Sequence, residues 1–261
     1  MFLVSTPAGA HGEDVVESVA FLKHVALNSR KFVTPSVFGI SSARTMGAYN
    51  GFVAGAVATS SRSTKGGDLE FDASTAAGFG LGSPRKNIGF DTYLGIISVN
   101  PEGADGGFGV GEDGNMSFKA GHTFLTDSFD SISLAAGVNN LIAWGEAERI
   151  NENVYGVATL GSSVMLGGSV VPFSLSLGAG AKQKQNEEFG MFAGLGANLS
   201  DLIDVSAGYN ASRWVTGLTF KLYRLDNPIL RRFVVQLGVD DVFDNDHNRR
   251  GVLIVAMPFS L

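Results

Sequence analysis

The chain has 261 residues, 35 of them glycine, with no cysteine and a formal net charge of −6, a length that suits one large all-β domain or two small domains. Only 17% of the residues are charged, against roughly 25% in ordinary globular domains, and the absence of a basic run or stripe argues against a nucleic-acid partner. Mean hydropathy is +0.16, yet no stretch approaches the ~18 consecutive apolar residues of a transmembrane helix, so the apolar residues must be dispersed by alternation.

The N-terminus has features of an export signal. A short apolar patch, Phe2-Leu3-Val4, precedes Ala8-Gly9-Ala10, which has the small-x-small form of a signal-peptidase site. No positive n-region precedes the patch. We expect residues 1–12 to be a truncated signal peptide, with a disordered terminus as the alternative.

Helical periodicity follows over 13–28. Acidic residues favour its first turn, and apolar residues recur at helical spacing in the order Val15, Val19, Leu22 and Ala26. We therefore predict an amphipathic helix within residues 13–30.

From about Phe32 onward strand-like alternation replaces the helical period. One face of 69–81 carries Leu69, Phe71, Ala73, Thr75, Ala77, Phe79 and Leu81, whereas the other carries mostly small or polar residues. The same division recurs over 173–182, 189–198 and 213–222. Such segments run for about ten residues, the length of a tilted strand crossing a bilayer, whereas ordinary strands run for about five or six.

Two architectures produce this alternation. In a soluble barrel or sandwich the polar face meets water and should carry many lysines and glutamates. In a membrane barrel the polar face lines the lumen. Here that face is mostly Gly, Ser, Thr and Asn, and small side chains suit the concave interior of a narrow barrel. We therefore predict an all-β fold, an antiparallel transmembrane β-barrel spanning 31–261.

The strand count follows from the centres of alternation. There are thirteen candidates, near Val37, Ala54, Thr75, Gly95, Lys119, Leu134, Val157, Leu177, Ala193, Val205, Gly217, Val235 and Val255. Single-chain bacterial barrels have an even number of strands, and Pro35 interrupts the first candidate. We therefore expect about twelve strands. The predicted helix within 13–30 would plug the barrel or lie on its periplasmic side, and residues 32–40 would lie inside the lumen or on the same side.

Counting back from the C-terminus assigns the connections to two sides. Outer loops are expected near 63–67, 100–114, 140–152, 182–188, 210–212 and 243–250. Inner turns are expected near 83–86, 126–130, 166–170, 200–201 and 225–230. The outer set is generally longer, as membrane barrels require.

The last strand carries the resemblance to a known class. Every second residue shares one apolar face, in the order Leu253, Val255, Met257, Phe259 and Leu261. This ending resembles the C-terminal signal that the barrel-insertion machinery reads in Gram-negative outer-membrane β-barrels. The resemblance implies an outer-membrane location, with membrane lipid and that machinery as partners. Val255, Met257, Phe259 and Leu261 are the expected insertion signal. The general layout also resembles barrels associated with exopolysaccharide export, which adds periplasmic export partners as a hypothesis.

Ionisable residues on the lumen phase are the candidate site. In a pore such groups set ion selectivity or hold a plug. The pore-lining candidates are Glu70, Asp72, Asp91, Lys119, Lys182, Asp204, Arg213 and Lys221. Alternatively, they pair across neighbouring strands and only satisfy one another. Glu70, Asp72 and Asp91 fall on adjacent expected strands as an acidic wall, which Lys119 on the next strand could neutralise.

We expect no enzymatic activity, no metal site and no cofactor. Of the four histidines, His122 falls on the lipid phase beside Phe124, which places a catalytic base poorly. A group of acidic residues and one histidine near 240–247 is interpreted as a solvated turn rather than a Ca²⁺ site; it comprises Asp240, Asp241, Asp244, Asp246 and His247.

The leading functional hypothesis is a passive channel or transport barrel for small solutes or an exported polymer. The alternative is a non-transporting structural or assembly barrel associated with exopolysaccharide or fibre export. A second alternative is a soluble β-barrel that binds a ligand.

Overall fold

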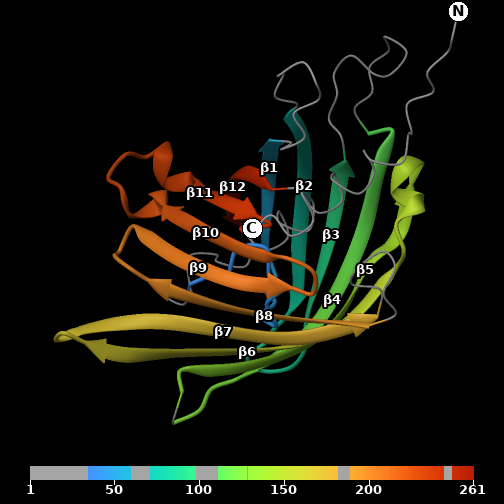
Figure 1. Cartoon of the computed structure of the whole chain (residues 1–261). Coiled ribbons are helices and arrows are strands. Elements are labelled where there is room, and N and C mark those ends of the chain that lie inside the picture. The colour runs from blue at the N-terminus through green and yellow to red at the C-terminus, as the bar shows by residue number, and fades with distance from the viewer. Residues whose placement is uncertain (1–34, 60–70, 98–110, 128, 182–188, 244–248) are drawn as a thin grey trace, which may run out of the picture.

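The protein folds as a closed antiparallel β-barrel (Figure 1). The structure, a computed structural model, describes residues 35–59, 71–97, 111–127, 129–181, 189–243 and 249–261. Over these residues twelve strands pair with their neighbours in sequence, and β1 pairs with β12 to close the barrel. The strands are β1 Asn50–Thr59, β2 Phe71–Gly82, β3 Gly89–Ile97, β4 Asp113–Phe124, β5 Ser131–Trp144, β6 Asn153–Leu166, β7 Ser169–Ala181, β8 Phe189–Asn198, β9 Ile203–Asn210, β10 Trp214–Lys221, β11 Val234–Asp240 and β12 Arg250–Ser260.

The predicted fold class and strand count are confirmed. Each expected strand centre from Ala54 to Val255 lies within a strand, and each expected inner turn falls at a connection between two strands, although 166–170 also includes the last residue of β6 and the first two of β7. The exception is the segment around Val37, which belongs to no strand and lies inside the barrel.

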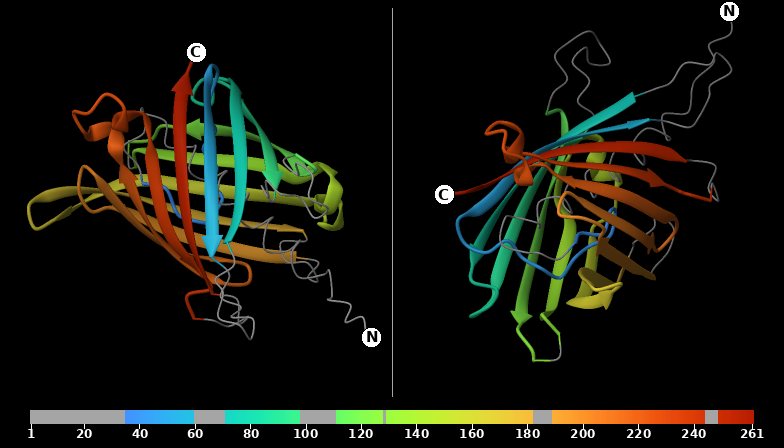
Figure 2. Two further views of the ribbon diagram at one scale, coloured as in Figure 1. Left: turned by 90° about the horizontal axis from the view of Figure 1, so that it is seen from above. Right: turned by 90° about the vertical axis from the view of Figure 1, so that its left-hand side faces the viewer.

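The barrel has two distinct ends (Figure 2). β1 starts and β12 finishes at one, which we call the terminus end. The connections β2–β3, β4–β5, β6–β7, β8–β9 and β10–β11 also lie there. The opposite, loop end carries the generally longer connections, as the extracellular side of an outer-membrane barrel does. The terminus end is therefore the expected periplasmic side.

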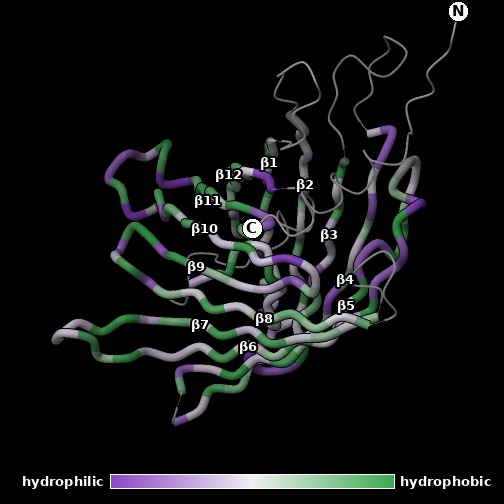
Figure 3. The backbone as a smooth tube through the Cα atoms, viewed as in Figure 1, coloured by the Kyte–Doolittle hydropathy of each residue, from purple (hydrophilic) through white to green (hydrophobic). Residues whose placement is uncertain are grey.

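Polarity is arranged inside out. Large apolar side chains face outward on strands far apart around the barrel: Leu94 of β3 is 40% exposed, Leu177 of β7 53% and Leu237 of β11 44%. Inward side chains include buried Ser133, Thr159 and charged residues. Figure 3 shows hydrophobic residues recurring along the strands. A soluble barrel would have the reverse arrangement. A closed barrel with this distribution is a transmembrane barrel of the outer-membrane type, as predicted.

The seam between β1 and β12 includes one close side-chain fit. Phe259 is paired with Gly51 across the seam, and a Cβ added at Gly51 would lie 2.7 Å from the Phe259 ring. The apolar face of β12 points outward, with Val255 and Met257 each 38% exposed and Leu261 81% exposed. Their role as an insertion signal stays a prediction.

Helices are minor in the described residues. They are the 3₁₀ turns η2 Gly145–Arg149, η3 Leu222–Arg224 and η4 Leu230–Arg232. No helix in this part of the chain is long and apolar enough to cross a membrane. The predicted signal segment 1–12 and the predicted helix within 13–30 lie outside the described residues.

The outward apolar face yields the first testable prediction. Leu177 lies midway along the lipid-facing part of β7, so Leu177→Arg should lower the free energy of unfolding from phospholipid vesicles by about 2–4 kcal/mol. The matched control is Leu199→Arg, because Leu199 is 70% exposed in the β8–β9 turn, where a charge should cost little. Equal effects of the two substitutions in a denaturant titration would contradict the assignment of a lipid-facing surface.

Candidate functional site: a chain segment inside the lumen

Residues 35–48, which we name the strap, cross the interior of the barrel. Val37, Phe38 and Ile40 are 5%, 1% and 2% exposed, so they are enclosed on all sides. The strap adopts no regular structure, and Gly39 and Gly47 have φ of 69° and 76°, values that residues with a Cβ rarely adopt. It contacts the inner wall in the middle of the barrel and in its terminus-end half, and these contacts run around the wall from β11 through β9, β6 and β4 to β2.

Glycines in the wall provide the space for the apolar side chains of the strap. A Cβ added at Gly217 or Gly238 would lie 2.6 or 2.2 Å from atoms of Phe38. Gly194 and Gly208 stand in the same relation to Ile40. Small lumen-facing residues therefore serve a packing function, because larger ones would exclude the strap.

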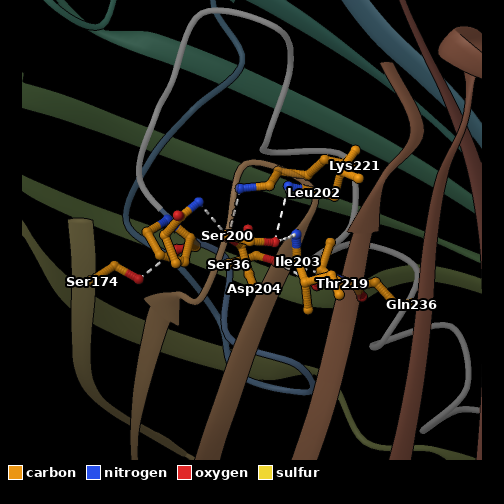
Figure 4. A network of polar contacts seen from close by, with 11 residues as sticks. Ser36, Ser174, Ser200, Leu202, Ile203, Asp204, Thr219, Lys221 and Gln236 are labelled. Carbon is orange, nitrogen blue, oxygen red and sulfur yellow. Dashed lines mark hydrogen bonds and ion pairs between the residues drawn. The ribbon is translucent and has the colours of Figure 1, made fainter. Parts of the chain in front are cut away.

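One end of the strap is held by polar side chains of β7 to β11 (Figure 4). Ser174 donates a hydrogen bond to the carbonyl of Pro35. Gln236 Nε2 donates to Ser36 Oγ at 3.0 Å and to Thr219 Oγ1 at 2.9 Å. The buried wall therefore recognises the strap through its polar atoms as well as through packing.

A buried ion pair holds the other end. Lys119 Nζ of β4 lies 3.2 Å from Asp91 Oδ2 of β3 and also donates to the carbonyls of Arg44 at 2.7 Å and Ser42 at 3.3 Å. Asp91 Oδ1 accepts the main-chain N–H of Met46 at 2.9 Å. Both charged side chains are buried, so the pair and the strap main chain satisfy one another in a site that bulk water does not reach.

Further charge pairs lie elsewhere in the interior. Lys221 Nζ lies 2.7 Å from Asp204 Oδ1 near the terminus end. At the loop end Asp240 Oδ2 accepts from Arg213 Nη1 at 3.3 Å and from Arg250 Nη2 at 3.2 Å. Each buried carboxylate in these pairs faces at least one cation, which compensates the loss of its hydration.

The structure brings together several of the residues predicted from sequence. Asp91, Lys119, Asp204 and Lys221 face the interior as two ion pairs, so their pairing across strands is observed. Arg213 pairs with an aspartate that was not a candidate. The charge of Asp91 in the expected acidic wall is neutralised by Lys119. The remaining candidates cannot be placed: Glu70 and Lys182 lie outside the described residues, as does the side chain of Asp72.

Sequence analysis misplaced two aspartates and missed two inward-facing polar residues. The solvated-turn interpretation is wrong for Asp240 and Asp241, which are both 0% exposed, because Asp240 lies between two arginines. Asp244, Asp246 and His247 lie outside the described residues. Sequence analysis did not single out Arg250 and Gln236. Both lie at inward-facing positions of their strands, and the alternation of the strands could have identified them.

His122 lies on the outer face, as predicted. Its ring stacks edge-on against Phe124, with centroids 4.4 Å apart, and its Nδ1 contacts the carbonyl of Asn87. The expectation that the protein is not an enzyme stays a prediction.

Comparison with known proteins finds similar folds. No protein-family model matches the sequence, and no curated protein matches it. An outer membrane channel from Pseudomonas putida F1 is similar with a TM-score of 0.49 at 8% identity, over 81% of this chain and 96% of that one. Outer membrane phospholipase A from Escherichia coli has a TM-score of 0.46 at 10% identity, over 94% and 98%. The translocator domain of an autotransporter from Neisseria meningitidis has 0.40 at 12%, over 82% and 89%. These similarities concern barrel architecture and do not assign an activity.

The ion pair that holds the strap can be tested by removing one charge. Lys119→Met should lower the free energy of unfolding by about 3–5 kcal/mol, because Asp91 then stays buried without its cation. The double variant Asp91→Asn/Lys119→Met should recover part of that loss in the same titration. A single substitution that costs nothing would show that the pair is not buried in the folded barrel.

The packing of Phe38 against the wall glycines can be tested by adding a methyl group to one of them. Gly238→Ala places a Cβ within 2.2 Å of the Phe38 ring, so it should cost about 1–3 kcal/mol and displace the strap. Gly156→Ala is the control, because a Cβ there meets nothing within 4 Å. When Phe38 is already replaced by alanine, the added Gly238→Ala should cost almost nothing, because its Cβ no longer meets the Phe38 ring. An equal cost of Gly238→Ala with and without Phe38 would show that Phe38 does not pack against this glycine.

Proposed function

We propose that the protein is a passive channel of the outer membrane for small solutes, and that the strap closes its passage. The observation that carries the proposal is the combination of an inner wall that bears many polar side chains with a chain segment that is not part of the wall. A barrel that only needed to be filled could use the wall side chains alone, as narrow eight-stranded barrels do.

The chemistry of the inner wall supports the passage of small solutes. Hydroxyl and amide side chains such as Ser117, Ser133 and Asn115 line it, and they exchange hydrogen bonds readily with water and with polar solutes. The charges at Asp91 and Asp204 are balanced by lysines, so these sites favour neither ion sign strongly. Because the strap reaches across to opposite strands, the geometry favours small solutes over an exported polymer.

The attachment of the strap supports a gating role. The strap is held by hydrogen bonds with wall side chains such as those of Thr159, Asp91 and Gln236, which take no part in the main-chain ladders that hold the barrel together. The strap can therefore leave the wall without breaking the sheet, and water can take over the hydrogen bonds that it leaves.

A second candidate is a non-transporting structural or assembly barrel. The close fit of Phe38 and Ile40 against wall glycines favours it, because such packing suits a permanent seal. The two candidates differ in one observable, which is whether the strap ever moves away from the inner wall.

A disulfide tether tests the proposal. Ser36 Oγ and Thr219 Oγ1 lie 3.4 Å apart, and the chain has no cysteine of its own, so Ser36→Cys/Thr219→Cys should cross-link the strap to β10. In planar bilayers the oxidised variant should show at least tenfold less conductance than its reduced form. Reductant should restore the wild-type level.

The control links the wall only to itself. Thr123 Oγ1 and Ser133 Oγ lie 2.9 Å apart on β4 and β5, so oxidising Thr123→Cys/Ser133→Cys should leave conductance unchanged. A silent wild-type protein that stays silent in the Gly238→Ala variant, where the strap is displaced, would reject the channel and favour the structural barrel.

A further inference from the structure

The β10–β11 connection stands apart from the other turns at the terminus end. It runs over residues 222–233 and contains η3 and η4, whereas two residues separate β6 from β7 and four separate β8 from β9. Tight turns suffice to connect neighbouring strands of a barrel. The extra length therefore calls for a role other than connection.

Local hydrogen bonds give this turn a defined shape. Asn227 Oδ1 accepts the main-chain N–H groups of Ile229 at 2.9 Å and Leu230 at 3.1 Å. The carbonyl of Asn227 accepts the N–H of Arg231 at 3.1 Å. An asparagine side chain that caps its own turn in this way holds the following residues in fixed positions. Ile229 to Arg232 are thus presented as a preformed surface.

That surface combines exposed apolar and basic side chains. Ile229 is 68% exposed and Leu230 42% exposed, and Arg231 and Arg232 follow them directly and are also exposed. With Arg224, the turn has three arginines against one aspartate, Asp226, which gives a net charge of +2. Figure 3 shows hydrophilic and hydrophobic residues alternating in this turn. Two exposed large aliphatic residues are a liability in water but not at a lipid interface.

The position of the turn places it beside lipid. It continues β10 and β11, whose outward residues Leu218 and Leu237 form a cross-strand pair and are 39% and 44% exposed. Three residues closer to the turn, Lys221 pairs with Val234. Lys221 is the last residue of β10 and Val234 is the first residue of β11. The turn therefore lies at the terminus-end border of the outward apolar face, near the level of the lipid headgroups.

From these observations we infer that residues 222–233 form a binding site for anionic phospholipid headgroups. Ile229 and Leu230 insert at the boundary between headgroups and acyl chains, and Arg231 and Arg232 bind the phosphates. Arginine suits this role because its planar guanidinium donates two parallel hydrogen bonds to phosphate oxygens. A lipid occupant is favoured over an acidic protein because the turn continues two strands whose outward residues Leu218 and Leu237 already face lipid. The inference holds whether or not the barrel conducts.

The first test measures lipid selectivity of the full-length folded barrel by native mass spectrometry. After extraction from vesicles of phosphatidylethanolamine and phosphatidylglycerol, the wild type should retain phosphatidylglycerol preferentially. Arg231→Gln/Arg232→Gln should reduce that preference roughly thirtyfold, because each of the two surface arginines contributes of the order of 1 kcal/mol to binding an anionic membrane. Heat-modifiability on a gel verifies that each variant is folded.

The matched control is Arg85→Gln/Lys86→Gln, which removes the same charge from the β2–β3 turn at the same end. It should leave the preference within about twofold of the wild type. An equal loss in both variants would show general charge attraction and overturn the site. An unchanged preference in Arg231→Gln/Arg232→Gln would overturn it as well.

The second test locates the aliphatic pair. The chain has no cysteine, so Ile229→Cys can carry a single environment-sensitive fluorophore. In vesicles its emission should shift to the blue and be quenched by lipids brominated near the headgroup. Emission typical of water, together with arginine-dependent binding of polyglutamate in place of phosphatidylglycerol selectivity, would overturn the inference in favour of an acidic protein partner.

Discussion

The requirement that every main-chain N–H and C=O be paired inside a hydrocarbon layer governs this structure. A sheet can meet it only by closing on itself, and here the β1–β12 ladder does so from Asn50 opposite Ser260 to Ala58 opposite Val252. Closure then divides the side chains of each strand between an outer and an inner surface. Because alternate residues point to opposite faces, the apolar half of each strand must face lipid and the other half must be accommodated within. The inside-out polarity of the barrel is thus a consequence of closure within a hydrocarbon layer.

The interior has its own constraint, which is that buried polar groups must find partners. The wall supplies some of them, as in the pair of Asp204 with Lys221. The strap supplies others: its main chain gives Lys119 two carbonyl acceptors and gives Asp91 an N–H donor. Glycines then let Phe38 and Ile40 approach the wall closely. Strap and wall are therefore complementary in polarity and in shape.

The barrel itself was largely predictable from sequence, because alternation over about ten residues is a local pattern and turns recur between such segments. The strand centres, the inner turns and the lipid position of His122 all followed from that pattern. For the strap, sequence analysis predicted only that residues 32–40 lie inside the lumen or on the periplasmic side. It has no period, and its contacts join residues far apart in sequence, as with Ser36 and Gln236. The burial of Asp240 was missed for the same reason, since it depends on Arg213 and Arg250 from neighbouring strands.

The central claim is that the strap lies inside the lumen of a membrane barrel. Thiol reactivity measures this directly, because the chain has no cysteine. Ala43 is 1% exposed within the strap, whereas Tyr49, just after it, is 66% exposed. In folded barrels in vesicles open to the reagent on both sides, Ala43→Cys should resist a membrane-impermeant maleimide while Tyr49→Cys reacts. Equal rates of labelling at the two positions would place the strap outside the lumen and contradict the account.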